Sequence, residues 1–438
     1  MQRSSKPTCA PLPIPDLPPP QVHTLANGVR VVCDPMPGLE TLALSVVAGR
    51  GARFEDAARS GWSHLLEHMV FKGAGVRSAR SIVETIEAAG GSINAATGYE
   101  RTSYQVRALR GGLDLGLAVT SDLVLRPTLD LDDLQREKQV VAQEIAEAAD
   151  TPDDLVFELA QEAAFAGQPL GRPILGSPAS IGTATPASLE AWRRAIYAPD
   201  ALVISAAGAV DVAELLALAD RDFGHSPTGE SLPDPEPAHF VGGLRPVGKR
   251  LEQANLAILL PGVGVRDPDY FAIRLFAEIL GGGMASRLFQ EARERRGLAY
   301  AIDAYAETYA ETGVLGIFAG CAAGEAVQLA QVVAQELSGM TRGVEPAELS
   351  RAKAQLKASL FMSRESALAR AEQAAGQVLL FGQVLASADL AEQIDAVTPD
   401  DLVRLGESIL GARLSAVAVL GARPALGAGE AFDRALFG

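Results

Sequence analysis

The two halves of this chain share one order of predicted elements, and this repeat limits its fold more than any other feature. A proline-rich stretch at residues 224–243 separates the halves. Each half is expected to begin with apolar strands, to continue through helices into a strand pair, and to end with helices and one further strand. The repeat predicts an α+β fold of two homologous domains, each an antiparallel-rich sheet packed by helices, that arose by internal duplication.

Turn, start and stop signals place the individual elements. Asn27-Gly28 predicts a hairpin within Val22–Asp34, Gly90-Gly91 ends a helix over Ser78–Ala89, and Thr185-Pro186 starts another. In the second half we expect a helix over Ala285–Glu294 and one long helix over Ser366–Leu385. The remaining expected strands are Thr41–Ala48, Ser92–Thr97, Thr102–Leu109, Leu202–Ala207, Leu251–Leu260, Ala301–Tyr309, Gly313–Ala319 and Val417–Leu420. The remaining expected helices are Leu113–Leu125, Leu131–Ala149, Leu155–Phe165, Val212–Asp222, Asp269–Leu280, Ala326–Thr341 and Pro346–Ser363.

Charge and cysteine usage exclude several classes of function. The net charge of −16 argues against a nucleic-acid partner, which needs a basic surface. The 3 cysteines, Cys9, Cys33 and Cys321, lack CxxC spacing, so we expect no disulfide framework and a reducing, cytoplasmic location. No apolar run reaches the length of a membrane-spanning helix, and we expect no membrane partner.

Residues 61–73 hold a dense set of potential metal ligands. His64, Glu67 and His68 lie close together here, although the whole chain has only 5 histidines. On a helix, His64 and His68 are one turn apart on one face, where two imidazoles can hold one metal ion. Glu67 adjoins that face and can take a proton from water at the metal. This HxxEH pattern is that of the inverted zinc peptidases, although two histidines so spaced also occur as plain surface or core residues.

A third ligand must come from elsewhere, because catalytic zinc usually takes three protein ligands and leaves one position for water. Glu137 and Glu144 lie two helical turns apart in a predicted helix, so both can point the same way. Glutamates are common on exposed helix faces, and this spacing alone does not select a metal ligand. The pairing with His64 and His68 favours the metal site.

Together these residues resemble the insulinase/pitrilysin family of zinc peptidases, and the half-length chain resembles its mitochondrial processing peptidase branch and bacterial relatives. The similarity runs from about residue 22 to the end of the chain. It includes Asn94-Ala95 with Thr97 and Glu100, the loop at residues 169–176, and Arg293 followed by Gly297-Leu298-Ala299-Tyr300.

The resemblance implies a role for each site position. His64, His68 and Glu144 would bind Zn²⁺. Glu67 would be the general base, and Glu137 would orient a ligand histidine. Arg293 and Tyr300 would reach from the second domain to the substrate backbone and stabilise the developing oxyanion. Otherwise they are a helix-end cation and a strand aromatic.

Substrate contacts are implied at three places. Asn94 and Ala95 lie on an expected edge strand, to which an extended peptide would add as another strand. Phe71 would line the pocket for the residue after the cut, or belong to ordinary helix core. Asp154 and Glu158 would hold an arginine shortly before the cut. Residues 130–162 contain 11 Asp/Glu against 2 Lys/Arg, so these two acids could equally belong to a solvated acidic face.

Composition and the resemblance together divide the chain into segments. Residues 1–21 would be a disordered proline-rich tail and 22–225 a zinc-binding catalytic domain. Residues 226–243 would be a proline-rich linker, and 244–438 a homologous domain that lacks the metal motif, since the only histidine beyond residue 225 is His239.

Three functions remain open. The first is a zinc-dependent endopeptidase that cleaves peptides or unfolded, presequence-like segments inside a closed chamber. The second is a non-catalytic scaffold or regulatory subunit of a peptidase heterodimer, which the intact metal motif disfavours. The third is a small-molecule lyase such as S-ribosylhomocysteine lyase, which shares HxxEH but uses a cysteine ligand absent here. Pitrilysin-type enzymes carry four such domains and this chain two, so we expect a homodimer or a heterodimer with a homologous subunit.

Overall fold

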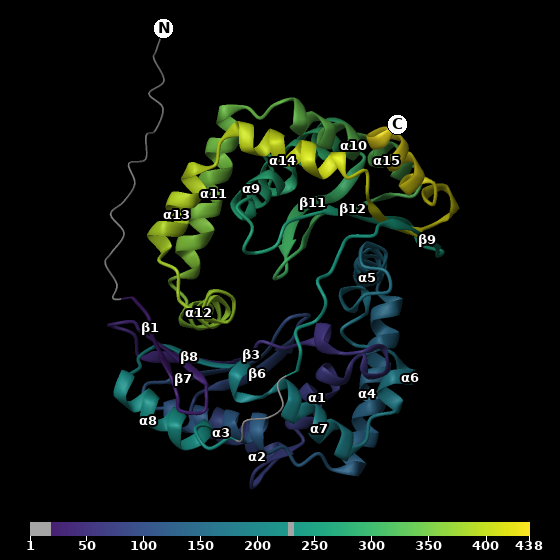
Figure 1. The fold of residues 1–438 in the computed structure, drawn as a ribbon. Helices are drawn as coiled ribbons and strands as arrows, with labels where there is room; N and C mark the ends of the chain where they lie inside the picture. Colours follow the sequence, from purple (N-terminus) through teal and green to yellow (C-terminus); the bar gives the residue numbers. More distant parts are fainter. Residues whose placement is uncertain (1–18, 227–231) are drawn as a thin grey trace.

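A computed structural model describes residues 19–226 and 232–438, which contain two large sheets with matching topology (Figure 1). Parts of the predicted tail and linker, together with Cys9, lie outside these described residues. The first sheet has the order β1-β2-β8-β3-β7-β6 and the second β11-β12-β10-β13-β9. The first sheet contains β1 (Gln21–Thr24), β2 (Arg30–Pro35), β3 (Thr41–Ala48), β6 (Ser92–Thr97), β7 (Thr102–Leu109) and β8 (Leu202–Gly208). The second contains β9 (Gly243–Gly248), β10 (Gln253–Pro261), β11 (Ala299–Thr308), β12 (Gly313–Ala322) and β13 (Ala416–Gly421).

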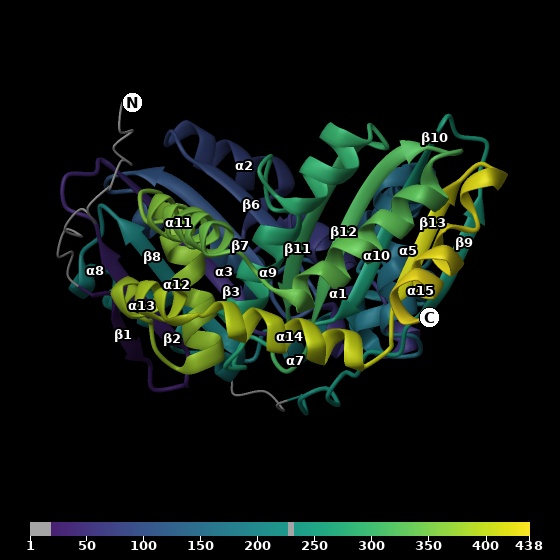
Figure 2. The ribbon, with the colours of Figure 1, turned by 90° about the horizontal axis from the view of Figure 1, so that it is seen from above.

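The two sheets repeat one pairing pattern strand by strand. The pair β2 and β8 is parallel, as is β9 and β13, and the other pairs are antiparallel. Seen from above, β11, β12, β10, β13 and β9 lie side by side (Figure 2). The order from β2 to β6 therefore matches the order from β9 to β11, and the predicted α+β duplication is confirmed.

The helices also follow one another in matching order in the two halves. Those of the first half are α1 (Trp62–Val70), α2 (Ala79–Ala88), α3 (Leu113–Leu125), α4 (Leu131–Asp150), α5 (Pro152–Ala164), α6 (Pro178–Gly182), α7 (Pro186–Ile196) and α8 (Val212–Phe223), with a short hairpin, β4 (Gly73–Ala74) and β5 (Arg77–Ser78), after α1. Those of the second half are α9 (Tyr270–Gly281), a π-helix at Phe289–Arg295, α10 (Ala326–Arg342), α11 (Pro346–Ser363), α12 (Ala367–Phe381), α13 (Ser387–Ala396), α14 (Pro399–Gly411) and α15 (Ala428–Phe437).

Several predicted boundaries in the second half are wrong. The single helix expected over Ser366–Leu385 stops at Gly382, which takes the left-handed conformation with φ 72° that often ends helices. The helix expected over Ala285–Glu294 is mostly π-helical. The segments α13, α14, α15 and β9 were not predicted, and β9 carries Pro246 because it is an edge strand.

Each sheet is covered on one face by a helix that belongs to the other half. In the first sheet Val32, Val47 and Val203 face α12, where they pack against Ala375 and Val378. Their neighbours along each strand face the helices of their own half. In the same way α5 packs against Leu259, Ala418 and Leu420 of the second sheet. Figure 1 shows both helices between the two sheets. The packing therefore crosses the predicted domain boundary in both directions.

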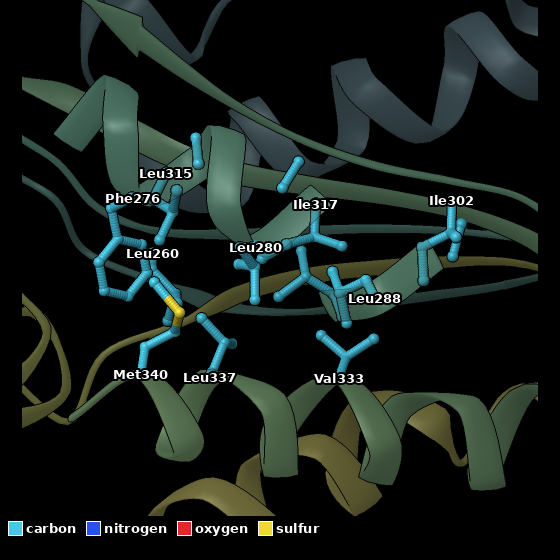
Figure 3. Packing of buried hydrophobic residues seen from close by; sticks show 14 of the residues in the cluster. Leu260, Phe276, Leu280, Leu288, Ile302, Leu315, Ile317, Val333, Leu337 and Met340 are labelled. Carbon is cyan, nitrogen blue, oxygen red and sulfur yellow. The ribbon is translucent and has the colours of Figure 1, made fainter. Parts of the chain in front are cut away.

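The largest core lies in the second half, between its sheet and its own helices. Phe276 and Leu280 of α9 point toward Leu337 and Met340 of α10, and Leu315 lies on the side away from α10 (Figure 3). Because helices cover both faces of the central strands, β10 reads as a nearly continuous apolar run.

A buried ion pair ties α12 to the first sheet. Arg370 donates from Nε to Asp34 Oδ2 at 2.6 Å and from Nη2 to Asp34 Oδ1 at 2.5 Å. The two side chains are only 6% and 2% exposed. This pair is a specific link between the halves.

We expect Arg370→Met to lower the free energy of unfolding by about 3–5 kcal/mol, because it leaves a buried carboxylate without its partner. Urea denaturation of the full chain measures this change. Arg404→Met is the matched control: it breaks an exposed pair with Asp269, and we expect a loss of about 0–1 kcal/mol. Equal effects for the two variants would show that the buried pair has no special role.

Within the described ranges, no helix combines the length and apolar character needed to cross a bilayer.

Candidate metal centre

A buried carboxylate fixes the start of α1, the helix that carries the histidines. Glu55 Oε2 accepts from the backbone N–H of Gly61 at 2.7 Å, and Oε1 accepts from that of Ser63 at 2.6 Å. These are among the N–H groups that a helix start leaves without partners. Burial raises the pKa of Glu55 to about 7, and the bond from Ser63 opposes that shift. Gly61 has φ 87°, and a Cβ there would lie 2.5 Å from the carbonyl oxygen of Leu175. The loop at residues 169–176 therefore packs directly on the start of α1.

The structure brings His64, His68 and Glu144 together. The two imidazole rings have centroids 4.7 Å apart. Glu144 Oε2, from α4, lies 3.9 Å from His64 Nε2 and 3.5 Å from His68 Nε2. One ligand atom from each residue lies within 4.8 Å of the others, and no other such group was found among the described residues. Helices α1 and α4 therefore bring these three side chains to one place.

The donor set fits a zinc ion. Burial and the neighbouring His68 lower the pKa of His64 to about 4, so its imidazole is neutral and can act as a ligand at neutral pH. Glu144 Oε2 is buried and has no hydrogen-bond partner among the described residues, which is costly for a carboxylate oxygen unless a cation lies nearby. Two imidazoles and one carboxylate are a common protein ligand set for catalytic zinc.

Glu137 lies behind His68 rather than among the converging ligand atoms. It is 5% exposed, and its Oε2 is 3.1 Å from His68 Nδ1. Its other oxygen, Oε1, is 2.7 Å from Lys72 Nζ. The position suits a carboxylate that orients a ligand histidine.

Glu67 points toward the edge strand β6. Thr97, the last residue of β6, donates its hydroxyl to Glu67 Oε2. Burial raises the pKa of Glu67, and the bond from Thr97 opposes that shift. Asn94 and Ala95 lie on the same strand, which pairs with β7 on one side and ends the sheet on the other. The proposed base is therefore held at one end of an open sheet edge.

The remaining predicted substrate residues lie at the end of α1 and on α5. Phe71 follows the last turn of α1 and packs, half-buried, against the core of the first half. Asp154 and Glu158 lie on α5, where burial and then Asp154 raise the pKa of Glu158. Their substrate roles remain predictions.

Arg293 and Tyr300 lie in the second half. Arg293 is exposed, in the π-helix, with its guanidinium 4.7 Å from the Phe289 ring centroid. Tyr300 is 48% exposed, at a bulge where β11 pairs with β12. In the described residues no hydrogen bond or ion pair joins either side chain to His64, His68 or Glu144. The roles of both residues therefore remain predictions.

Arg53 links the second half to the surroundings of β6, and the sequence reading missed it. Its side chain is 4% exposed and donates from Nη1 to Glu100 Oε1 at 2.6 Å and to Glu311 Oε2 at 2.9 Å. Glu100 lies in the turn after Thr97, and Glu311 lies in the β11–β12 turn. Glu55 and Lys72 were missed in the same way, because each acts through a contact that appears only once the chain has folded.

Family comparisons agree with this geometry. Residues 30–178 match the family Insulinase (Peptidase family M16), and residues 183–356 match the family described as Peptidase M16 inactive domain. An uncharacterized zinc protease of Rickettsia felis is 33% identical over 401 residues, which cover 91% of this chain and 97% of that protein. An uncharacterized zinc protease of Bacillus subtilis is 33% identical over 376 residues, which cover 86% and 92%.

Solved structures show the same fold. A protease from Helicobacter pylori aligns with a TM-score of 0.86 at 22% identity, over 92% of this chain and 100% of that chain. The peptidase M16 inactive domain from Pseudomonas fluorescens aligns with a TM-score of 0.85 at 22% identity, over 92% and 98%. These structures support the architecture alone, whereas the sequence relatives share enough identity along nearly the whole chain to show descent. The chain therefore belongs to the insulinase family of zinc peptidases, peptidase family M16.

Proposed function

We propose that this chain is an active zinc-dependent endopeptidase that cleaves peptides and unfolded, presequence-like segments. The observation that carries the proposal is the convergence of His64, His68 and Glu144 beside Glu67, which Thr97 ties to an open strand edge. The relatives named zinc protease support it.

The chain's own residues suit hydrolysis of an extended peptide. When bound at this site, zinc would supply a Lewis acid and lower the pKa of its water toward about 7. Glu67 would accept the proton of the attacking water and pass it to the leaving amine. Its raised pKa brings it closer to the range a general base needs. The open edge of β6 would hold the substrate through backbone hydrogen bonds, which impose little sequence preference.

A non-catalytic scaffold is the alternative, since one matched family and one solved relative are described as an inactive domain. That family match covers residues 183–356, which do not include His64, Glu67, His68 or Glu144. The ligand set in the first half therefore favours the enzyme. The cytoplasmic location proposed from cysteine usage is compatible with Cys33 and Cys321, both of which are buried free thiols.

We further propose that two chains pair, either two copies or this chain and a homologous subunit, to close a chamber around the substrate. In this arrangement Arg293 and Tyr300 of one subunit would serve the metal centre of the other. The exposure of both side chains supports this arrangement. The π-helix under Arg293 supports it too, since such turns often occur at functional sites.

Mixing two inactive variants tests this proposal. We expect Glu67→Gln and Tyr300→Phe to cleave a peptide poorly when pure. The two variants would be dissociated, mixed and reassembled, so that some dimers contain one copy of each. In such a hybrid dimer one metal centre has an intact Glu67 and receives an intact tyrosine from the other subunit, and we expect cleavage to return. Hybrid dimers without restored cleavage would contradict action across subunits. Light scattering would establish the assembly of the unmodified chain. If that chain cleaves no peptide in any assembly, the proposed enzymatic function is wrong.

A further inference from the structure

A lysine next to the metal centre has no role in the hydrolysis described above. Lys72 follows His68 by one helical turn, and its backbone N–H still bonds to the Met69 carbonyl at 3.1 Å. This extra turn points residues 68 and 72 toward the same stretch of α4. Both side chains reach one residue there, Glu137.

The two oxygens of Glu137 are divided between these neighbours. Oε1 is 2.7 Å from Lys72 Nζ, and Oε2 is 3.1 Å from His68 Nδ1. Glu137 is 5% exposed, and Lys72 is the only lysine or arginine within 4.0 Å of it in the described part of the chain. A buried carboxylate needs such a counter-charge, because burying an unpaired charge is costly.

We propose that Lys72 is a positioning residue of the metal centre: it fixes the Glu137 carboxylate, which then holds His68 with Nε2 turned toward Glu144. Because Lys72 binds Oε1 of Glu137, Oε2 is left to accept a hydrogen bond from Nδ1–H of His68. That bond selects the tautomer whose lone pair is on Nε2, the atom 3.5 Å from Glu144 Oε2. The inference rests on the proposed zinc site and adds a residue that would act on it only through Glu137.

Zinc affinity of the full-length chain tests the role, measured by competition with a chromophoric chelator. We expect Lys72→Met to weaken zinc binding by about 10–100-fold, the usual cost of losing a group that orients a ligand. Lys72→Arg keeps a cationic donor, and we expect its affinity to stay within about threefold of the unmodified chain. Lys357→Met is the matched control, because it removes an equal charge from a remote pair with Asp395, and we expect no change in affinity.

A double-variant cycle separates positioning from a general charge effect. If Lys72 acts through Glu137, then Lys72→Met should add almost nothing once Glu137→Gln is present. An unchanged zinc affinity in Lys72→Met, or the same fold loss in the Glu137→Gln background, would overturn this inference alone. Failure of the unmodified chain to bind zinc would overturn the metal site, and the inference with it.

Discussion

Glu67→Gln should bind zinc as the unmodified chain does and yet cleave peptides about 10²–10⁴-fold more slowly, the range that a positioned general base contributes. The amide keeps the shape of the side chain, but it cannot accept a proton from water. Glu67 is not one of the three converging ligand atoms, so the metal site should persist. Metal analysis and initial cleavage rates on the same sample measure both properties.

Glu147→Gln is the matched control for that variant. Glu147 is exposed on α4, one turn beyond Glu144, so the substitution removes one negative charge near the site without changing the base. We expect its cleavage rate and zinc content to match those of the unmodified chain. Near-normal turnover in Glu67→Gln would exclude the general-base role, whereas zinc loss in that variant would show that Glu67 is needed for the metal.

His68→Ala should lose both zinc and activity. The change removes one of the three proposed ligands and also the partner of Glu137. We expect zinc affinity to fall by more than about 100-fold, beyond the roughly 10–100-fold cost of losing a group that only orients a ligand. His225→Ala, which changes an exposed histidine outside the site, is the control and should retain both properties. Full zinc occupancy in His68→Ala would show that the ligand assignment is wrong.

The family and the duplicated α+β fold could be predicted because their signals are local. His64, Glu67 and His68 lie within one helix. The paired strands either alternate between apolar and polar residues or are apolar throughout, and turn residues separate them. Thr398-Pro399 starts α14 with the same capping pattern as Thr185-Pro186 in α7, and this second instance was overlooked.

The exchange of α5 and α12 between the halves could not be predicted. An apolar helix face does not name the sheet it will cover, and only the folded arrangement shows that each helix packs on the sheet of the other half. The same holds for Lys72 and Glu55, since a lone lysine or glutamate carries no local sign of the partner it will meet. Sequence therefore indicated the proposed ligands and Glu137 behind His68, but not Lys72, which contacts Glu137, or Glu55, which fixes the start of α1.

The most direct test of the account is the zinc dependence of cleavage by the full chain. The protein would be stripped with a chelator, returned to zinc-free buffer, and titrated with Zn²⁺ while cleavage of an unfolded polypeptide is followed. The account predicts no cleavage at the start, a rise that stops at about one zinc per chain, and little cleavage of the same polypeptide when it is folded. Cleavage that persists without metal, or a chain that binds a full equivalent of zinc and still cleaves nothing, would contradict it.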